Sequence, residues 1–240
     1  MVIAIVGAGG KTTALYCLGH KLSAMGRCAL LTTTTRIYRP DDIPLYLGPP
    51  ERLRLKAPLM AAASGMADAR KLAGYSAGDI GAITSLGLFD DILVEADGAA
   101  RKPIKSPNDT EPVYPQPVDL IIGVIGLDAL GQPATEENVH RLPLFTSVTG
   151  ASAGKPIAAE HVLALIRHKN GLFRHAPVGA SRVVFLNKYD TIIDENARRQ
   201  AEEIVQNSPY PALLTGYGMD WPEEFIRRFM PELYQPSKGE

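Results

Sequence analysis

The sequence has few cysteines and almost no excess of charge. Its 240 residues include only 2 Cys, and 25 Lys and Arg residues nearly balance 26 Asp and Glu residues. Cys17 and Cys28 lie among apolar residues without the C-x-x-C spacing of a zinc or redox site, so we expect two free, buried thiols. A net charge of −1 excludes a nucleic-acid-binding protein that depends on a large basic surplus. We therefore expect no nucleic-acid partner.

Long apolar runs are also absent. No run approaches the roughly 20 residues that a membrane-spanning helix requires, and the apolar segment at residues 2–6 is too short for the core of a signal peptide. We expect a cytoplasmic protein that does not bind a membrane. The length suits one large α/β domain, and neither a repeat nor a linker divides the chain, so we assign residues 1–240 to a single domain.

Glycine and proline are frequent instead, with 22 and 19 residues, and we place them in loops. Between them, short apolar runs alternate with segments of helical period, which predicts a mainly parallel, doubly wound α/β sheet with helices on both faces. Residues 36–55 are predicted to form an excursion without regular structure. The predicted strands cover residues 2–6, 28–32, 59–63, 92–96, 118–125, 182–186 and 210–215. The predicted helices cover residues 12–25, 76–86, 158–169, 194–205 and 222–228.

The first predicted strand leads through a glycine-rich turn, Gly7-Ala8-Gly9-Gly10-Lys11-Thr12-Thr13, into a helix. Such a turn lets backbone N–H groups point at an anion where the helix dipole also favours negative charge. Lys11 can then reach the β- and γ-phosphates, and the Thr12 hydroxyl can bind Mg²⁺. The full spacing G-x-x-x-x-G-K-[ST] fails because Ile5 replaces a glycine, so the loop is shortened. It still predicts nucleotide binding in a P-loop NTPase-like fold, against the alternative of a plain turn.

Two acidic residues lie at the end of the strand predicted at residues 92–96. Glu95 and Asp97 are two apart in an extended chain, so their carboxylates point the same way. An apolar strand that ends in acids is typical of the Walker B arrangement, in which a carboxylate holds Mg²⁺ directly or through water. We expect Asp97 to join Thr12 at the metal and Glu95 to lie near the attacking group. A solvated loop is the alternative.

A basic turn comes directly after these acids. The turn is held by Pro103 and Pro107, and its Arg101, Lys102 and Lys105 suit a second anion, such as a phosphorylated substrate. Thr34 belongs to a run of four threonines after the second predicted strand, where a hydroxyl can contact the γ-phosphate or a metal-bound water. The alternative for this run is β-propensity followed by a turn.

Later segments add candidates for base recognition and catalysis. Asn187-Lys188-x-Asp190 follows a predicted strand and matches the N-K-x-D signature of G proteins, in which the Asp accepts from guanine and the Lys stem packs on the ring. A polar turn is the alternative. His140 is a candidate proton relay or substrate contact and Arg141 a candidate transition-state cation, unless both are surface residues.

Several segments together resemble the YqeC family: V-G-A-G-G-K-T-T, T-T-T-T, V-E-A-D-G-A-A-R-K-P-I-K-S-P, I-G-L-D-A-L-G and V-H-R. The resemblance implies a cytoplasmic bacterial or archaeal accessory protein associated with selenium-dependent molybdenum hydroxylases, and it names no reaction. The family motif residues that it implies are Gly7, Gly9, Gly10, Lys11, Thr12, Glu95, Asp97, Gly98, Lys102, Lys105, His140 and Arg141.

The hypothesis that joins these motifs is an Mg²⁺-dependent ATP- or GTP-binding protein that matures a selenium-dependent molybdenum hydroxylase or its cofactor. The turnover would be hydrolysis or phosphoryl transfer, with Lys11, Glu95, Asp97 and Arg141 as catalytic residues. A nucleotide-gated chaperone without significant turnover is the alternative. A ligase that forms an acyl phosphate has weaker support, because only the short loop, which is similar to that of the Mur ligases, favours it. The sequence leaves the oligomeric state open.

Overall fold

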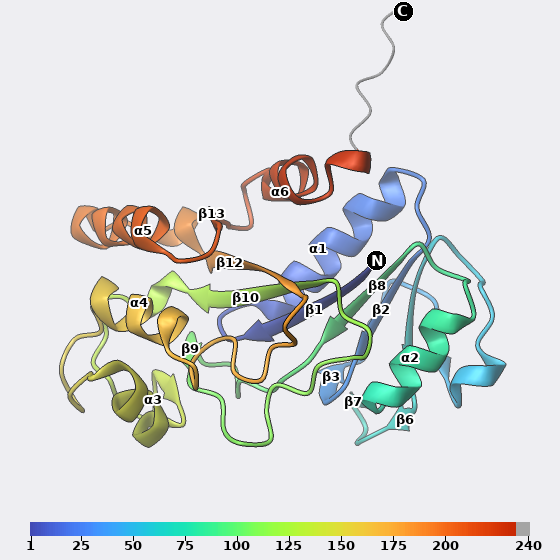
Figure 1. Ribbon diagram of the computed structural model, residues 1–240, viewed down its shortest axis with the longest axis horizontal. Helices are drawn as coiled ribbons and strands as arrows, with labels where there is room; N and C mark the ends of the chain where they lie inside the picture. The colour runs from blue at the N-terminus through green and yellow to red at the C-terminus, as the bar shows by residue number, and fades with distance from the viewer. Residues whose placement is uncertain (234–240) are drawn as a thin grey trace, which may run out of the picture.

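The computed structural model describes residues 1–233 and builds them around an eight-stranded sheet (Figure 1). Every pairing in this sheet is parallel. In their order across the sheet, the strands are β13 (Ala212–Leu214), β12 (Ser181–Asn187), β10 (Leu120–Gly126), β1 (Val2–Gly7), β8 (Asp91–Glu95), β2 (Ala29–Thr33), β5 (Leu59–Ala63) and β4 (Leu45–Leu47). Seven of them confirm the strands predicted from apolar runs.

The prediction for residues 36–55 was wrong. This segment contains β3 (Arg36–Tyr38), β4 and a 3₁₀ turn at Pro50–Arg52. β3 pairs with β7 (Lys71–Ala73), which pairs with β6 (Gly65–Met66), in a small antiparallel sheet. Such short strands lack a period long enough to detect in the sequence. β9 (Ile104–Lys105) and β11 (Val139–His140) form a second small sheet that was also not predicted.

Within residues 1–233, six α-helices surround the main sheet. They are α1 (Lys11–Ala24), α2 (Ala77–Ser85), α3 (Leu142–Thr149), α4 (Ala159–Arg167), α5 (Glu195–Asn207) and α6 (Trp221–Phe229). All but α3 were predicted. Ser76 and Asp79 form the expected capping box of α2, and Asp194 caps α5 through the Ala197 N–H group. The remaining 3₁₀ turns are Leu127–Ala129, Tyr189–Thr191 and Pro231–Leu233.

Both faces of the main sheet are covered, which explains why its strands read as continuous apolar runs. Ile3 and Ile5 of β1 pack in one cluster with α1 and α6, whereas Ala4 and Val6 pack in another with α4 and α5. A third cluster joins Val2 to α2. In Figure 1, α1 and α6 lie above the sheet and α2 and α4 below it. The doubly covered, parallel arrangement is therefore confirmed.

The strand order reverses at β1. The chain forms β2, β5, β4 and β8 on one side of this strand, and β10, β12 and β13 on the other. In open parallel sheets, ligands bind in the crevice outside the carboxyl ends of the strands at such a point. The glycine-rich turn follows β1 and therefore lies at this crevice.

The structure also bears on the two cysteines and on membrane-spanning helices. Cys17 and Cys28 are both free, but each is half-buried and not buried. Within residues 1–233, no helix is long and apolar enough to cross a membrane.

Candidate functional site

The turn after β1 has a backbone that only glycine adopts without strain. Gly7, Gly9 and Gly10 have φ values of +95°, +83° and +129°. A Cβ atom on Gly9 would lie 2.2 Å from the Gly126 nitrogen, and one on Gly10 would lie 2.1 Å from the Asn187 side-chain nitrogen. The turn is therefore held against the carboxyl ends of β10 and β12, and larger residues would displace it.

The backbone N–H groups of the turn divide into two sets. Those of Gly7, Ala8 and Gly9 donate to Asp97 Oδ2 (3.0 Å), the Val124 carbonyl (2.9 Å) and the Lys102 carbonyl (3.1 Å). In the part of the chain that the structure describes, the N–H groups of Gly10 and of residues 11–13 have no protein acceptor. These four groups at the start of α1 are the ones that remain for a phosphate.

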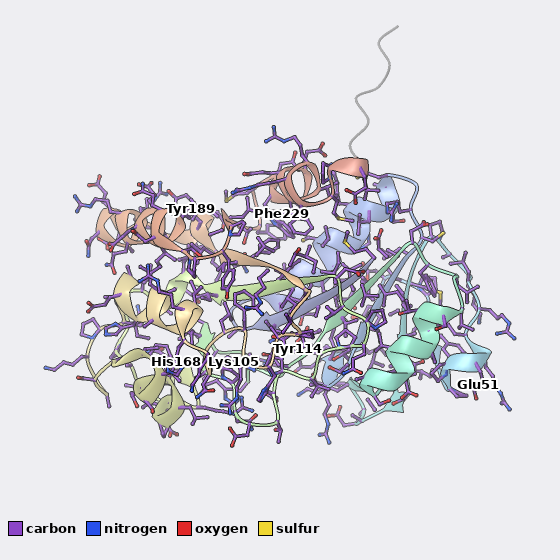
Figure 2. All side chains as sticks on the ribbon, viewed as in Figure 1. Glu51, Lys105, Tyr114, His168, Tyr189 and Phe229 are labelled. Carbon is purple, nitrogen blue, oxygen red and sulfur yellow. The ribbon has the colours of Figure 1, made fainter. Side chains whose placement is uncertain are left out.

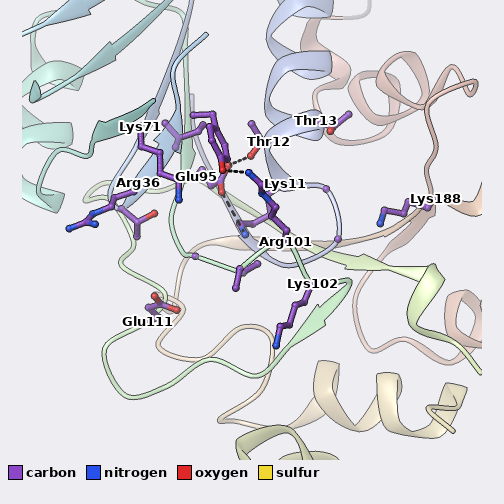
Figure 3. A pocket seen from close by; sticks show the side chains of 18 residues that line it. Lys11, Thr12, Thr13, Arg36, Lys71, Glu95, Arg101, Lys102, Glu111 and Lys188 are labelled. Carbon is purple, nitrogen blue, oxygen red and sulfur yellow. Dashed lines mark hydrogen bonds and ion pairs between the residues drawn. The ribbon is translucent and has the colours of Figure 1, made fainter. Parts of the chain in front are cut away.

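A cavity of about 690 Å³ opens in front of these N–H groups (Figure 3). Its walls come from the glycine-rich turn, from β3 and β7, from the loop after β8 and from Lys188 after β12. The charged side chains that line it are Lys11, Arg36, Lys71, Glu95, Arg101, Lys102, Glu111 and Lys188. The volume is in the range of small-molecule sites, and the excess of cations favours an anionic ligand.

Lys11 lies between two acidic residues at the end of β8, Glu95 and Asp97. Its Nζ donates to the Gly7 carbonyl (2.8 Å) and lies 3.2 Å from Asp97 Oδ1 and 3.7 Å from Glu95 Oε1. Burial opposes the charged form, but the two carboxylates outweigh it and raise the pKa of the Lys11 ammonium. Burial also raises the pKa of the Glu95 carboxyl, against the attraction of Lys11 and the hydrogen bond from Thr12. Both carboxylates thus lie within 4 Å of the same ammonium group.

Thr12 and Glu95 are two oxygen donors that face the cavity and lie side by side. The Thr12 hydroxyl donates to Glu95 Oε2 at 2.7 Å, and both residues line the cavity. Asp97, the carboxylate that the sequence placed at the metal, is 1% exposed and does not line the cavity, and its Oδ1 lies 3.2 Å from the Lys11 ammonium. Among residues 1–233, no group of three His, Cys, Asp or Glu could hold a metal by itself. One carboxylate and a hydroxyl nevertheless fit Mg²⁺, which usually takes its other ligands from phosphate and water.

Asp97 begins a chain of alternating charges that continues through Lys105 to Glu111 and Arg141. Lys105 Nζ lies 2.6 Å from Asp97 Oδ2 and 3.0 Å from Glu111 Oε2, which also accepts from Arg141 Nη1 at 2.8 Å. The side chain of Lys105, labelled in Figure 2, is 1% exposed. The structure thus places Lys105 and Arg141 on carboxylates and not on the cavity wall.

Two side chains in or beside this chain of charges, Glu111 and His140, have shifted pKa values. Burial favours the neutral form of Glu111, but hydrogen bonds and charges from Arg141 and Lys105 outweigh it and hold the pKa of the carboxyl at about 2. Burial, reinforced by the charges of Arg141 and Lys105, lowers the pKa of His140. His140 pairs with Lys105 in the β9–β11 sheet and does not line the cavity.

The threonine run, which begins in the last two residues of β2, is used mainly for structure. The hydroxyls of Thr32, Thr33 and Thr34 donate to the carbonyls of Ala62 (2.8 Å), Glu95 (2.7 Å) and Val113 (2.8 Å). Thr34 is therefore occupied in holding the loop at residue 113. The member of the run that lines the cavity is Thr35.

The N-K-x-D segment is tied to the loops around it. Asn187 Nδ2 donates to the Gly9 carbonyl at 2.8 Å, and its Oδ1 accepts from Thr215 at 3.1 Å. Lys188 lines the cavity and lies 2.6 Å from Asp128 Oδ2. Asp190 accepts the N–H groups of residues 217 and 218 at 3.0 and 3.3 Å and does not line the cavity.

Comparison with known proteins identifies the family. Residues 3–143 match the family model described as YqeC protein. The chain belongs to the YqeC family. It is 36% identical over 207 residues to a protein of Escherichia coli (strain K12) named Uncharacterized protein YqeC, a match that covers 84% of this chain and 80% of that protein. No solved structure gives a significant match.

The match to the family model, over residues 3–143, contains most of the site. It includes the glycine-rich turn, the acids at the end of β8 and the charge chain as far as Arg141, whereas the segment that begins at Asn187 lies outside it. It also includes three cavity residues that the sequence did not reveal: Arg36, Tyr38 and Lys71. Arg36 directly follows the threonine run but belongs to no recognisable motif. Lys71 joins the site only through the pairing of β7 with β3, which no local motif indicates.

Proposed function

We propose that the protein binds a nucleoside triphosphate with Mg²⁺ at the turn after β1, in a P-loop NTPase-like fold. The observation that carries the proposal is the set of four unpartnered N–H groups, at Gly10 and residues 11–13, which line the cavity at the start of a 14-residue helix. Lys11 would leave the Gly7 carbonyl to contact the phosphates. Thr12 and Glu95 would hold Mg²⁺, which neutralises phosphate charge when bound.

The test is a calorimetric screen of ATP, GTP, CTP and their diphosphates with Mg²⁺. We expect one triphosphate to bind, and Lys11→Ala to abolish its binding. Lys155→Ala is the matched control, because Lys155 is exposed and distant in sequence from every motif. The proposal is wrong if no nucleotide binds, or if the affinity is the same in both variants.

The base preference is a separate proposal. Asn187-Lys188-x-Asp190 favours guanine over adenine. The support is that Lys188 lines the cavity while Asn187 donates a hydrogen bond to the glycine-rich turn, which we call the phosphate loop. Asp190 would exchange the N–H groups of residues 217 and 218 for those of the base. We expect GTP to bind more tightly than ATP and Asp190→Ala to remove the difference. ATP binding as tight as GTP binding, with no effect of Asp190→Ala, would contradict this reading.

We propose further that turnover, by hydrolysis or phosphoryl transfer, serves the maturation of a selenium-dependent molybdenum hydroxylase or its cofactor. The support is YqeC membership, together with the association that the family resemblance implies. The second candidate is a nucleotide-gated chaperone, favoured by one observation: carboxylates hold both Lys11 and Arg141 in this conformation. Phosphate release, measured with and without such a hydroxylase, separates them. Steady release by the protein alone supports the enzyme, and no release in either case supports the chaperone.

A further inference from the structure

A group of cations lines the cavity on the side away from the N-K-x-D segment. Arg36 on β3, Lys71 on β7 and Arg101 in the loop after β8 all belong to it. Figure 3 shows Arg36 and Lys71 on one side of Lys11, and Lys188 on the other. We call Arg36, Lys71 and Arg101, with Tyr38 between them, the β3–β7 cation face.

Strand register fixes the direction of this face. Tyr38 lies directly opposite Lys71 in the antiparallel β3–β7 pair, and Arg36 is two residues from Tyr38, so the three side chains share one side of the small sheet. Ile37 and Leu72 alternate with them and are 6% and 2% exposed in the core. Because burial of this apolar pair anchors the sheet, the polar side chains stay turned toward the cavity.

Tyr38 holds two of the cations in place. The Lys71 Nζ and the Arg101 guanidinium carbon both lie 5.1 Å from the centre of its ring, and the guanidinium also donates to the Tyr38 hydroxyl. Ala100 and Arg101 have φ values of +49° and +62°, a conformation that residues other than glycine rarely adopt. A strained backbone that persists is a sign of a constrained functional position. The loop after β8 therefore presents Arg101 in a defined orientation.

These cations are not compensated by carboxylates. Lys11, Lys105, Arg141 and Lys188 each form an ion pair, whereas in residues 1–233 Arg36, Lys71 and Arg101 form none. Asp68 is close enough for the charges of Lys71 and Arg36 to help lower its pKa, after the hydrogen bonds it accepts from residues 70 and 71, but it is fully exposed. The face thus keeps a net positive charge for a ligand.

We propose that the β3–β7 cation face binds the phosphate group of a second small-molecule ligand, a phosphate monoester, beside the nucleotide. A monoester carries a charge of about −1.5 to −2 at pH 7, which suits several converging cations, and guanidinium groups bind two phosphate oxygens at once. The placement rests on the proposed function. A nucleotide with its base toward Lys188 and its phosphates at Lys11 directs its terminal phosphate toward this face.

The experiment titrates phenyl phosphate and inorganic phosphate into the full chain saturated with Mg²⁺ and the non-hydrolysable imido analogue of the best-binding triphosphate. The analogue fills the phosphate loop, so binding reports a second site. The double variant Arg36→Gln/Lys71→Gln is compared with Arg199→Gln/Lys56→Gln, an equal change of charge on exposed residues outside the cavity. We expect phenyl phosphate to bind at least tenfold more weakly to the first variant and the analogue to bind both with similar affinity. If the first variant does not fold, Arg101→Gln takes its place.

Three results would overturn the proposal. The first is no saturable binding of phenyl phosphate to the wild type, including the case in which only inorganic phosphate binds. The second is equal phenyl phosphate affinity in the two double variants. The third is an equal loss of the analogue and the ester, because the cations would then belong to the nucleotide site.

Failure of the proposed function is detected separately, as an absence of nucleotide binding to the wild type. In that case phenyl phosphate is titrated without nucleotide into Arg36→Gln/Lys71→Gln and into Lys11→Ala, and the two affinities are compared. Loss of phenyl phosphate binding in the double variant alone supports the second site, and retained binding in that variant overturns it.

Discussion

Five charged side chains alternate in sign from the phosphate loop to the start of α3: Lys11, Asp97, Lys105, Glu111 and Arg141. Removing one partner of a buried ion pair costs about 3–5 kcal/mol, because the other charge is left without compensation. The middle of this chain is buried, and Asp97 also accepts the N–H of Gly7. These ion pairs therefore connect the start of the phosphate loop to the loop that contains Glu111.

Glu111 makes this coupling sensitive to acid. Its pKa of about 2 lies below the ordinary value of 4.5, so the carboxylate stabilises the fold above about pH 4.5, and this contribution is lost as the pH falls toward 2. We expect Glu111→Gln to lower the free energy of unfolding at pH 7 by at most about 3 kcal/mol. Urea unfolding at several pH values between 7 and 3 measures the difference, which should shrink as the pH falls.

Glu136→Gln is the control for Glu111→Gln, because Glu136 is exposed and, within residues 1–233, forms no ion pair. It should change the unfolding free energy by less than about 0.5 kcal/mol at every pH. A difference between Glu111→Gln and the wild type that is constant with pH would show that the carboxylate does not make this contribution.

At the scale of elements, the phosphate loop depends on contacts with the ends of two neighbouring strands. Gly9 approaches the backbone of Gly126 at the end of β10, and Asn187 at the end of β12 bonds to the Gly9 carbonyl. Parallel strands bring their carboxyl ends to one edge, so these contacts form only when the sheet is assembled. The conformation of the loop is thus a property of three strands and not of the turn alone.

Gly9→Ala tests this dependence. Its Cβ would lie 2.2 Å from backbone at Gly126, whereas Gly131 has a similar φ of +77° and open space around it. Both alanines have the left-handed strain of about 1 kcal/mol, and only the first also meets backbone atoms. We expect Gly9→Ala to be destabilised by at least about 2 kcal/mol more than Gly131→Ala in urea unfolding and to bind nucleotide at least tenfold more weakly. Equal stability and equal affinity would show that the loop is not held by β10.

At the scale of the whole molecule, the cavity joins segments that are distant in the chain. Lys11, Lys71, Arg101 and Lys188 line one cavity although they lie in four separate parts of the sequence. A ligand that spans these segments stabilises the native state as a whole, since it binds the folded chain and not the unfolded one.

We therefore expect the Mg²⁺ complex of the best-binding triphosphate, at a free concentration of 100 Kd, to raise the free energy of unfolding by about 2.7 kcal/mol. Thermal unfolding followed by circular dichroism measures this as an increase in Tm. Lys11→Ala should show no increase at the same concentration, and Lys155→Ala should behave as the wild type. An equal increase in Lys11→Ala would place the ligand away from the phosphate loop.

Part of the fold and of the site was predictable because it is local. The apolar run that forms β10, the capping residue Ser76 and the glycines before Lys11 are each recognised within a few residues. Tyr38 was missed because β3 is only three residues long and carries no period. Lys105 was placed with the anion-binding residues because its sequence neighbours are basic, although its spatial neighbours are carboxylates.

The sequence by itself determined the alternation of strands and helices, the glycine turn and the family, because hydrophobic period and backbone permissiveness act over short stretches of chain. Only the tertiary structure decided which charges meet. It turned Arg141 and Lys105 toward Glu111, put Glu95 beside Thr12, and brought Arg36 and Lys71 to the cavity. The physical reason is that Coulomb interactions and burial depend on distance in space, and the order of the strands in the sheet sets that distance.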